Sequence, residues 1–231
     1  GLATLDFQGQ VDTSADHGQS GTLLLDPTNV LIVDDASIAN QTASPDEIDL
    51  FSDPNQGGIN PLTGLPVDGS VISASTLENQ QGNVIVQASN DITIQDLADN
   101  ELAFGAGGGA IALTADADSD GIGRFAMNPA DTIRTNGRNI SISGAALSLG
   151  ALDTSLNNNG GNATLTATNG DLRIAGTLNT ATLYTGVAPL PFVTEGSLIP
   201  RRGGNVSLTA TNGGIQVDGN LITATDPRSA T

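Results

Sequence analysis

Apolar and polar residues alternate in short runs along much of this chain. Val206 and Leu208 lie two residues apart with a polar residue between them, as do Ile215 and Val217. Successive side chains of a strand point to opposite faces, so this period of two predicts strands. Thr-Asn-Gly separates the two runs, and Asn and Gly tolerate the positive φ angles of a tight turn. A third short strand or bend is expected around Leu221.

The same unit recurs along the chain. Two copies align almost without gaps: GGNATLTATNGDLRIAGTLNTA from Gly160 and GGNVSLTATNGGIQVDGNLITA from Gly203. Weaker copies begin at Gln81, Gly108 and Asn136, and residues 4–13 match the second half of the unit. No run of ten or more residues combines the helical period of 3.6 with capping residues. The chain is therefore expected to consist of repeated short strands.

Two arrangements of these strands are open from local sequence. The Thr-Asn-Gly turn suits an antiparallel hairpin. A solenoid accounts better for the similar intervals between Gly82, Gly109, Gly137 and Gly161, because stacked coils bury one shared core. We predict an all-β fold, a right-handed parallel β-helix of about six coils, forming a single segment over residues 1–231.

Like residues are expected to stack in columns. One column holds small side chains at an inward corner: Ala88, Ala115, Gly144, Ala167 and Ala210. Asparagines also recur, with Asn162 and Asn205 before equivalent strands and Asn169 and Asn212 in equivalent turns. Their amides can hydrogen-bond to one another or to backbone and fix the register of the coils.

Two stretches interrupt the repeat. Residues 40–70 and 182–202 are rich in proline or glycine and are interpreted as loops or extruded hairpins. Loops on a rigid scaffold often carry binding sites, although inert excursions are the alternative. The chain starts and stops in mid-pattern without a capping element, so we expect an excised segment of a longer chain.

Composition narrows the function classes. The chain has 25 acidic residues against seven basic ones, all arginine, and a net charge of −18. This balance argues against nucleic acid and anionic membrane surfaces as partners, since both favour basic proteins. No apolar run approaches the roughly 20 residues that span a bilayer, so membrane insertion is not expected. Without cysteine, disulfide and thiolate chemistry are excluded. The first residues lack signal-peptide features, so any export signal would lie upstream.

The most specific chemical motif is DADSDG at residues 116–121. Carboxylates at alternate positions followed by glycine are typical of loops that wrap Ca²⁺. A full EF-hand loop also needs an acidic twelfth residue, where this chain has Met127, and flanking helices. A calcium site and a solvated acidic turn are thus the two interpretations. The ligands predicted for the first are Asp116, Asp118, Asp120, Ile122 (through its carbonyl) and Asp131.

Other acidic pairs and the single histidine carry weaker signals. The pairs Asp34-Asp35 and Asp96/Asp99 are interpreted as solvated turns. His17 has no second histidine or cysteine with which to hold zinc, and a Ser-His-Asp triad there is disfavoured.

The enzymatic alternative is a β-helical polysaccharide lyase or hydrolase. Arg134 and Arg138 follow the acidic motif and would line a shallow groove, although pairing with the acidic surface is favoured. Hydrolysis needs two facing carboxylates, and aromatic platforms for sugar rings are scarce at 3% aromatic residues. We predict that the chain is not an enzyme.

Several strings resemble a known family. GTLLLDPTNVLI from Gly21 to Ile32, NGRNISISGAALSLG from Asn136 and the two GGN units resemble the repeat region of filamentous-haemagglutinin-type exoproteins, the passengers of bacterial two-partner secretion. The likeness is strongest to cyanobacterial members and covers nearly the whole chain, with LLLDPTNV its most specific string. It implies a right-handed β-helical fibre, exported through an outer-membrane secretion partner that recognises upstream regions. The family's N-terminal secretion motifs are not found here, so this segment would be shaft.

Three functions follow as hypotheses. The first is a rigid spacer or adhesive fibre, secreted to the cell surface and binding a surface glycan or protein receptor. The second is a carbohydrate-binding or polysaccharide-degrading β-helix. The third is a calcium-dependent module that assembles end to end.

Overall fold

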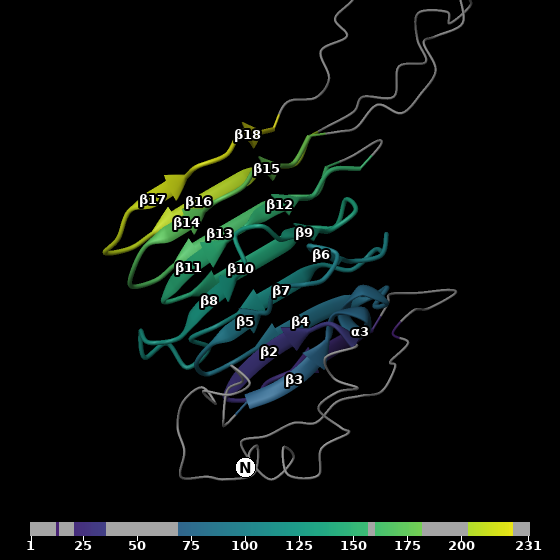
Figure 1. The fold of residues 1–231 in the computed structure, drawn as a ribbon, viewed down its shortest axis with the longest axis horizontal. Coiled ribbons are helices and arrows are strands. Elements are labelled where there is room, and N and C mark those ends of the chain that lie inside the picture. Colours follow the sequence, from purple (N-terminus) through teal and green to yellow (C-terminus); the bar gives the residue numbers. More distant parts are fainter. Residues whose placement is uncertain (1–12, 14–20, 36–68, 157–159, 182–202, 224–231) are drawn as a thin grey trace, which may run out of the picture.

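The computed structural model describes residues 13, 21–35, 69–156, 160–181 and 203–223, and there the chain winds through three sheets (Figure 1). The first sheet contains β1 (Thr22–Leu25), β4 (Asn83–Gln87), β7 (Ile111–Thr114), β10 (Ile140–Gly144), β13 (Ala163–Ala167) and β16 (Val206–Ala210). The second contains β3 (Gly69–Ser73), β2 (Asn29–Val33), β5 (Ile92–Ile94), β8 (Arg124–Met127), β11 (Ala146–Leu149), β14 (Leu172–Ile174) and β17 (Ile215–Val217). The third contains β6 (Glu101–Ala103), β9 (Thr132–Arg134), β12 (Ala151–Asp153), β15 (Leu178–Asn179) and β18 (Leu221–Ile222).

Neighbouring strands in these sheets are parallel, and the pairing follows the sequence repeat. Val84 pairs with Ile111, Ile111 with Ile140, and Ile140 with Ala163. The two strands beside Thr211-Asn212-Gly213 belong to different sheets, so the hairpin interpretation is wrong. The predicted parallel β-helix is confirmed, and the six strands of the first sheet define coils 1 to 6 in chain order.

One hydrophobic core runs through the coils. Ile142 and Leu165 pair in register and are fully buried, and Leu208 continues the column in the last coil. The predicted column of small residues is also present: Ala88, Ala115, Gly144 and Ala167 are buried, and Ala210 is half-buried at the C-terminal end. The alternation of apolar and polar residues within each coil therefore favours strands and places the apolar side chains in the core.

The asparagine columns form as predicted. Asn162 Oδ1 accepts from Asn205 N at 2.8 Å, and Asn139 Oδ1 accepts from Asn162 N at 2.8 Å. In the turns, Asn212 Nδ2 donates to Asn169 Oδ1 at 3.5 Å. Each asparagine thus ties one coil to an adjacent one and opposes a slip of register.

A strand and a short helix that sequence analysis did not anticipate cover the N-terminal side. β3 pairs with β2 on the side away from β5, and α3 (Ala74–Glu78) contacts both β3 and β6. Ser73 caps the helix by accepting from Thr76 N, and Leu77 is fully buried. A five-residue helix is too short to show a 3.6-residue period, which is why the pattern missed it.

Gly69 and Ser70, the last two residues of the predicted insertion at residues 40–70, begin β3. The rest of that insertion, the insertion at residues 182–202, and residues 4–12 lie outside the described residues. Among the helices that are described, none is long and apolar enough to cross a membrane.

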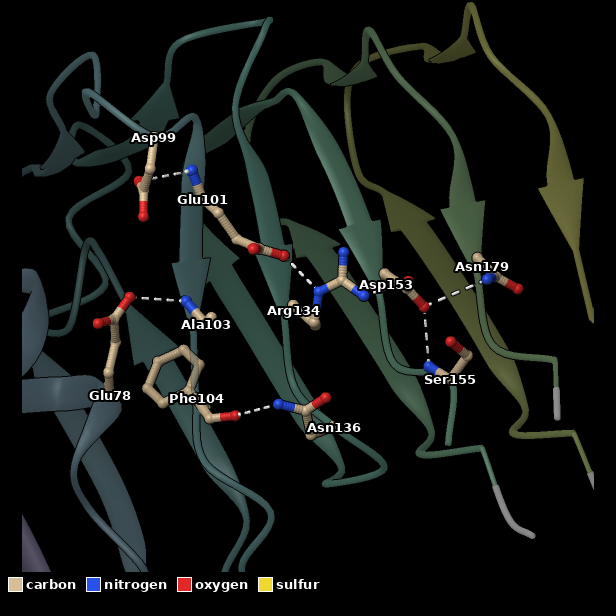
Figure 2. Close-up of polar contacts among 10 residues, drawn as sticks. All are labelled: Glu78, Asp99, Glu101, Ala103, Phe104, Arg134, Asn136, Asp153, Ser155 and Asn179. Carbon is tan, nitrogen blue, oxygen red and sulfur yellow. Dashed lines mark hydrogen bonds and ion pairs between the residues drawn. The ribbon is translucent and has the colours of Figure 1, made fainter. Parts of the chain in front are cut away.

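Glu78 closes the free edge of the third sheet. Its Oε1 accepts a hydrogen bond from Ala103 N at 2.8 Å (Figure 2). Its backbone carbonyl accepts from Gly105 N at 2.9 Å. Burial raises the pKa of Glu78, and the nearby charges of Asp99, Asp35 and Glu101 raise it further, while the Ala103 amide opposes them.

Replacing Leu165 by Ala tests the shared core. Leu165 is fully buried among apolar side chains, so the cavity left by its truncation is expected to lower the free energy of unfolding by about 2–5 kcal/mol. Thr164→Ala, on the outward face of the same strand, should change it by less than about 0.5 kcal/mol. Urea denaturation of both variants checks this, and equal effects would contradict the assigned inward face.

Replacing Glu78 by Gln tests the edge cap through pH. A carboxyl group whose folded pKa is raised contributes stability that is full below its ordinary value of 4.5 and is lost as pH rises through the folded value. Glutamine keeps an acceptor for Ala103 but does not ionise, so E78Q should gain stability relative to the parent chain between pH 4.5 and neutrality.

The measurement is urea denaturation at several pH values. Asp26→Asn, which removes an exposed carboxylate, controls for the general loss of negative charge. A stability difference between E78Q and the parent that stays constant with pH would refute the assignment.

Candidate functional site

The DADSDG motif forms a loop between β7 and β8. Asp116, Ser119 and Gly121 have positive φ angles of 56°, 61° and 86°. Asp116 Oδ1 accepts from Gly121 N at 2.9 Å and so closes the loop on itself. A side chain at Gly121 would combine an unfavourable φ with a Cβ 3.0 Å from Asn169 Nδ2, so glycine is required there.

This loop of coil 3 reaches the turn of coil 5. Thr168 Oγ1 donates to Asp116 Oδ2 at 3.3 Å, and Asn169 Nδ2 donates to Gly121 O at 3.1 Å. The contact is possible because coil 4 turns through Ala145 alone between β10 and β11. The acidic loop therefore fills the space beside a tight corner.

Three carboxylates converge in the loop. Asp116, Asp118 and Asp120 each place one oxygen within 4.8 Å of the others, with Asp116 buried and the other two exposed. Some of these oxygens already accept loop amides, since Asp120 Oδ1 accepts from Ile122 N at 2.9 Å. Carboxylate oxygens retain further lone pairs, so this donor set suits a hard cation such as Ca²⁺.

The other two predicted ligands are placed differently. The backbone amide of Ile122 faces Asp120, and its side chain is 69% exposed. Asp131 is not a member of the three-carboxylate group. It lies between β8 and β9, where its Oδ2 accepts from Leu97 N at 3.2 Å. The loop thus brings together three of the predicted residues, and Asp131 serves a different corner.

Comparison with known proteins finds no matching family model, no similar curated protein and no similar solved structure. The functional assignment therefore depends on the geometry of this chain and on the sequence strings described above.

The two arginines of the enzymatic hypothesis have structural partners. Arg134 forms ion pairs with Glu101 and, at 3.7 Å, with Asp153, as expected for pairing with the acidic surface (Figure 2). Arg138 is instead buried, at 3% exposure, and no ion pair between it and an acidic side chain forms among the described residues. Burial leaves it no access to a surface groove.

Arg138 bonds to backbone carbonyls of earlier coils. It donates to Gly109 O at 2.8 Å, Gln80 O at 2.7 Å and Gly82 O at 2.5 Å, and its guanidinium lies 5.7 Å from the centre of the Phe104 ring. The fork geometry of arginine satisfies three carbonyls at once, which a lysine cannot match. This bonding to backbone carbonyls was not predictable from the sequence, because a lone arginine in a turn is usually solvated.

A polar ladder follows the outward face of the third sheet. Arg134, Asp153 and Asn179 occupy paired positions on β9, β12 and β15, and Asn179 Nδ2 donates to Asp153 Oδ1 at 3.2 Å (Figure 2). Asp153 Oδ1 also accepts from Ser155 N at 2.9 Å. These contacts hold the third sheet to the turn that follows it.

Paired threonine and glycine residues close the corner between the third and first sheets. Gly161 N donates to Thr154 O at 2.8 Å, and Thr154 Oγ1 donates to Gly161 O. Thr180 and Gly204 repeat both bonds, at 2.7 and 2.8 Å. We call these pairs the Thr–Gly clamps. The second clamp joins the two ends of the segment that contains residues 182–202.

We propose that the loop of residues 116–121 binds Ca²⁺, which a titration followed by backbone amide NMR tests. Calcium should shift the amide resonances of Gly121 and Ile122, because both amides donate to carboxylates of the group. Binding in the range of about 10⁻⁴–10⁻³ M is expected, as in extracellular calcium modules.

The Asp118→Asn variant should weaken these shifts at least tenfold, because it removes an exposed ligand without a buried contact. Asp26→Asn should leave them unchanged. Absence of any shift at millimolar calcium would leave the motif as a solvated turn.

Proposed function

We propose that this chain is a shaft segment, with an adhesive role, of a secreted bacterial surface exoprotein of the filamentous-haemagglutinin type. It would reach the cell surface through an outer-membrane secretion partner acting on upstream regions, and it would carry no catalytic activity. The observation that carries the proposal is the in-register stacking of like side chains through one core. Such a scaffold is rigid and extensible by adding coils.

The surface chemistry supports an extracellular spacer. The chain has a net charge of −18, which keeps separate molecules apart in solution. Because the chain has no cysteine, the shaft is stabilised without disulfide bonds. The strings that resemble two-partner exoproteins lie on β1 and β2, on β10 and β11, and on the repeated β13–β18 units, so the resemblance and the coil structure coincide.

The Thr–Gly clamps support an adhesive role for residues 182–202. Thr154 and Gly161 are joined by the short linker 155–160, and Thr180 and Gly204 form the same clamp around a longer segment. The same pair of hydrogen bonds therefore forms whether the residues between threonine and glycine are few or many. Segments that a scaffold does not need for closure are free to carry recognition, and we assign the receptor contact, glycan or protein, to this one.

A calcium-dependent assembly module is the second candidate. It is favoured by the three-carboxylate loop and by the apolar C-terminal coil, where Ile215, Leu221 and Ile222 are 48%, 53% and 41% exposed. Calcium-dependent sedimentation of the parent chain, lost in Asp118→Asn, would favour this function. Sedimentation that is identical with calcium and with a chelator would exclude it.

A loop replacement tests the adhesive shaft. Residues 181–203 are replaced by Ser-Leu-Asn-Asn-Asn-Gly, the linker of residues 155–160, so that Thr180 and Gly204 can still form their clamp. The free energy of unfolding should change by only about 1 kcal/mol, because loop-closure entropy depends weakly on length. Beads coated with the variant should lose adhesion to bacterial cells and to glycan-coated surfaces at least tenfold relative to the parent chain.

Two results would contradict the proposal. Parent-coated beads that adhere no better than beads coated with the urea-unfolded chain would remove the adhesive role. A loop-replaced chain that fails to fold, as judged by the loss of its cooperative urea transition, would show that the clamps do not close the scaffold independently.

A further inference from the structure

Four acidic residues lie along the corner between the second and third sheets, away from the DADSDG loop. Asp34 follows β2 in coil 1, Asp96 and Asp99 lie between β5 and β6 in coil 2, and Asp131 precedes β9 in coil 3. We call these four residues the acidic corner. Three successive coils thus bring the same sign of charge to one edge of the solenoid.

Two of the carboxylates accept hydrogen bonds from the same turn, one from the preceding coil and one from the following coil. Asp34 Oδ2 accepts from Ala98 N at 2.9 Å, and Asp131 Oδ2 accepts from Leu97 N at 3.2 Å. Because these two amides are consecutive, the carboxylates of coils 1 and 3 both bond to one turn of coil 2. Their like charges repel each other, and a positive charge nearby would offset that repulsion.

Among the four residues, the charge of Asp131 is the most costly, because this side chain is the buried one. The residue is 0% exposed, and its Oδ1 has no hydrogen-bond partner. A buried carboxylate is costly unless it is paired or binds a metal. The ion pairs among the described residues involve Glu101, Asp153 and Asp218, and none of them includes a member of the acidic corner. Asp131 therefore carries a buried oxygen without a hydrogen-bond partner, next to other carboxylates.

We propose that the acidic corner binds an oxygen-seeking divalent cation, Mg²⁺ or Ca²⁺, with Asp131 Oδ1 as a direct ligand. All the donors are oxygens, which these hard cations prefer. Within the described chain, three carboxylate oxygens lie within 4.8 Å of one another only in the DADSDG loop. The cation at the acidic corner therefore contacts fewer carboxylates and completes its shell with water, as Mg²⁺ commonly does.

The alternative source of compensation is a proton. Burial raises the pKa of Asp131, and the charges of Asp96, Asp34 and Asp99 raise it further, against the opposing hydrogen bond from Leu97. A proton and a cation would compete for the same oxygen. The two are separable, since only the cation makes the corner respond to added metal at constant pH.

The experiment is a titration of the whole chain with MgCl₂ and, separately, CaCl₂, up to about 10 mM, beyond the weakest calcium modules. The amide resonances of Leu97 and Ala98 report the acidic corner, and those of Gly121 and Ile122 report the DADSDG loop. Saturable shifts of Leu97 and Ala98 are expected with at least one of the two metals. At a tenfold excess over the dissociation constant, the thermal midpoint should rise by about 3–6 °C.

Matched variants locate the response. Asp131→Asn should abolish the metal shifts of Leu97 and Ala98 and leave any calcium shift of Gly121 and Ile122 intact, and Asp118→Asn should do the reverse. Asp34→Asn, at a partly exposed position, serves as a second variant should Asp131→Asn fail to fold, and it should weaken binding at least tenfold. The proposal is overturned if neither metal moves Leu97 and Ala98 while a change of pH does, or if the shifts persist in both corner variants.

Discussion

Parallel stacking in register is the constraint on which this structure depends. Each side chain lies above its equivalent in the neighbouring coil at about 4.8 Å, so a position must suit its own copies. Gly82 and Gly109 show the limit, since a Cβ on Gly109 would overlap the backbone of Gly82. The same rule aligns Ile142, Leu165 and Leu208 in the core. A repeat in the sequence is thus the direct consequence of a repeat in the packing.

The rule that stacks apolar residues also stacks charges, and the chain handles these in different ways. Along the third sheet, Arg134 separates Glu101 from Asp153. Before equivalent strands, uncharged asparagine side chains stack, and each accepts a hydrogen bond from the backbone amide of the asparagine in the next coil. At the acidic corner, no ion pair among the described residues includes one of the four carboxylates, and we propose that a bound cation offsets their charge. Stacking therefore explains the ladders that are satisfied within the chain, and it also brings like charges together at this corner.

Sequence was most informative where one coil copies another. The strands around Leu165 and Leu208, the third strand at Leu178 and Leu221, and the asparagine columns all followed from alternation and alignment. It was least informative where a coil departs from the repeat. β3 and α3 have no copies elsewhere in the chain, and the burial of Arg138 depends on carbonyls more than fifty residues earlier. Asp131 was grouped with Asp116 on proximity in sequence, but the intervening β8 carries it to the next corner.

Disulfide trapping tests parallel stacking most directly, because the chain has no native cysteine. Thr164 and Ser207 are exposed partners on β13 and β16, and adjacent strands place their Cα atoms about 4.8 Å apart, within disulfide range. Thr209 and Gln216 would face each other only in a hairpin closed at Asn212-Gly213. Under mild oxidation, cysteines at 164 and 207 should cross-link nearly completely, and cysteines at 209 and 216 should stay reduced. The opposite outcome would contradict the β-helix and everything inferred from it.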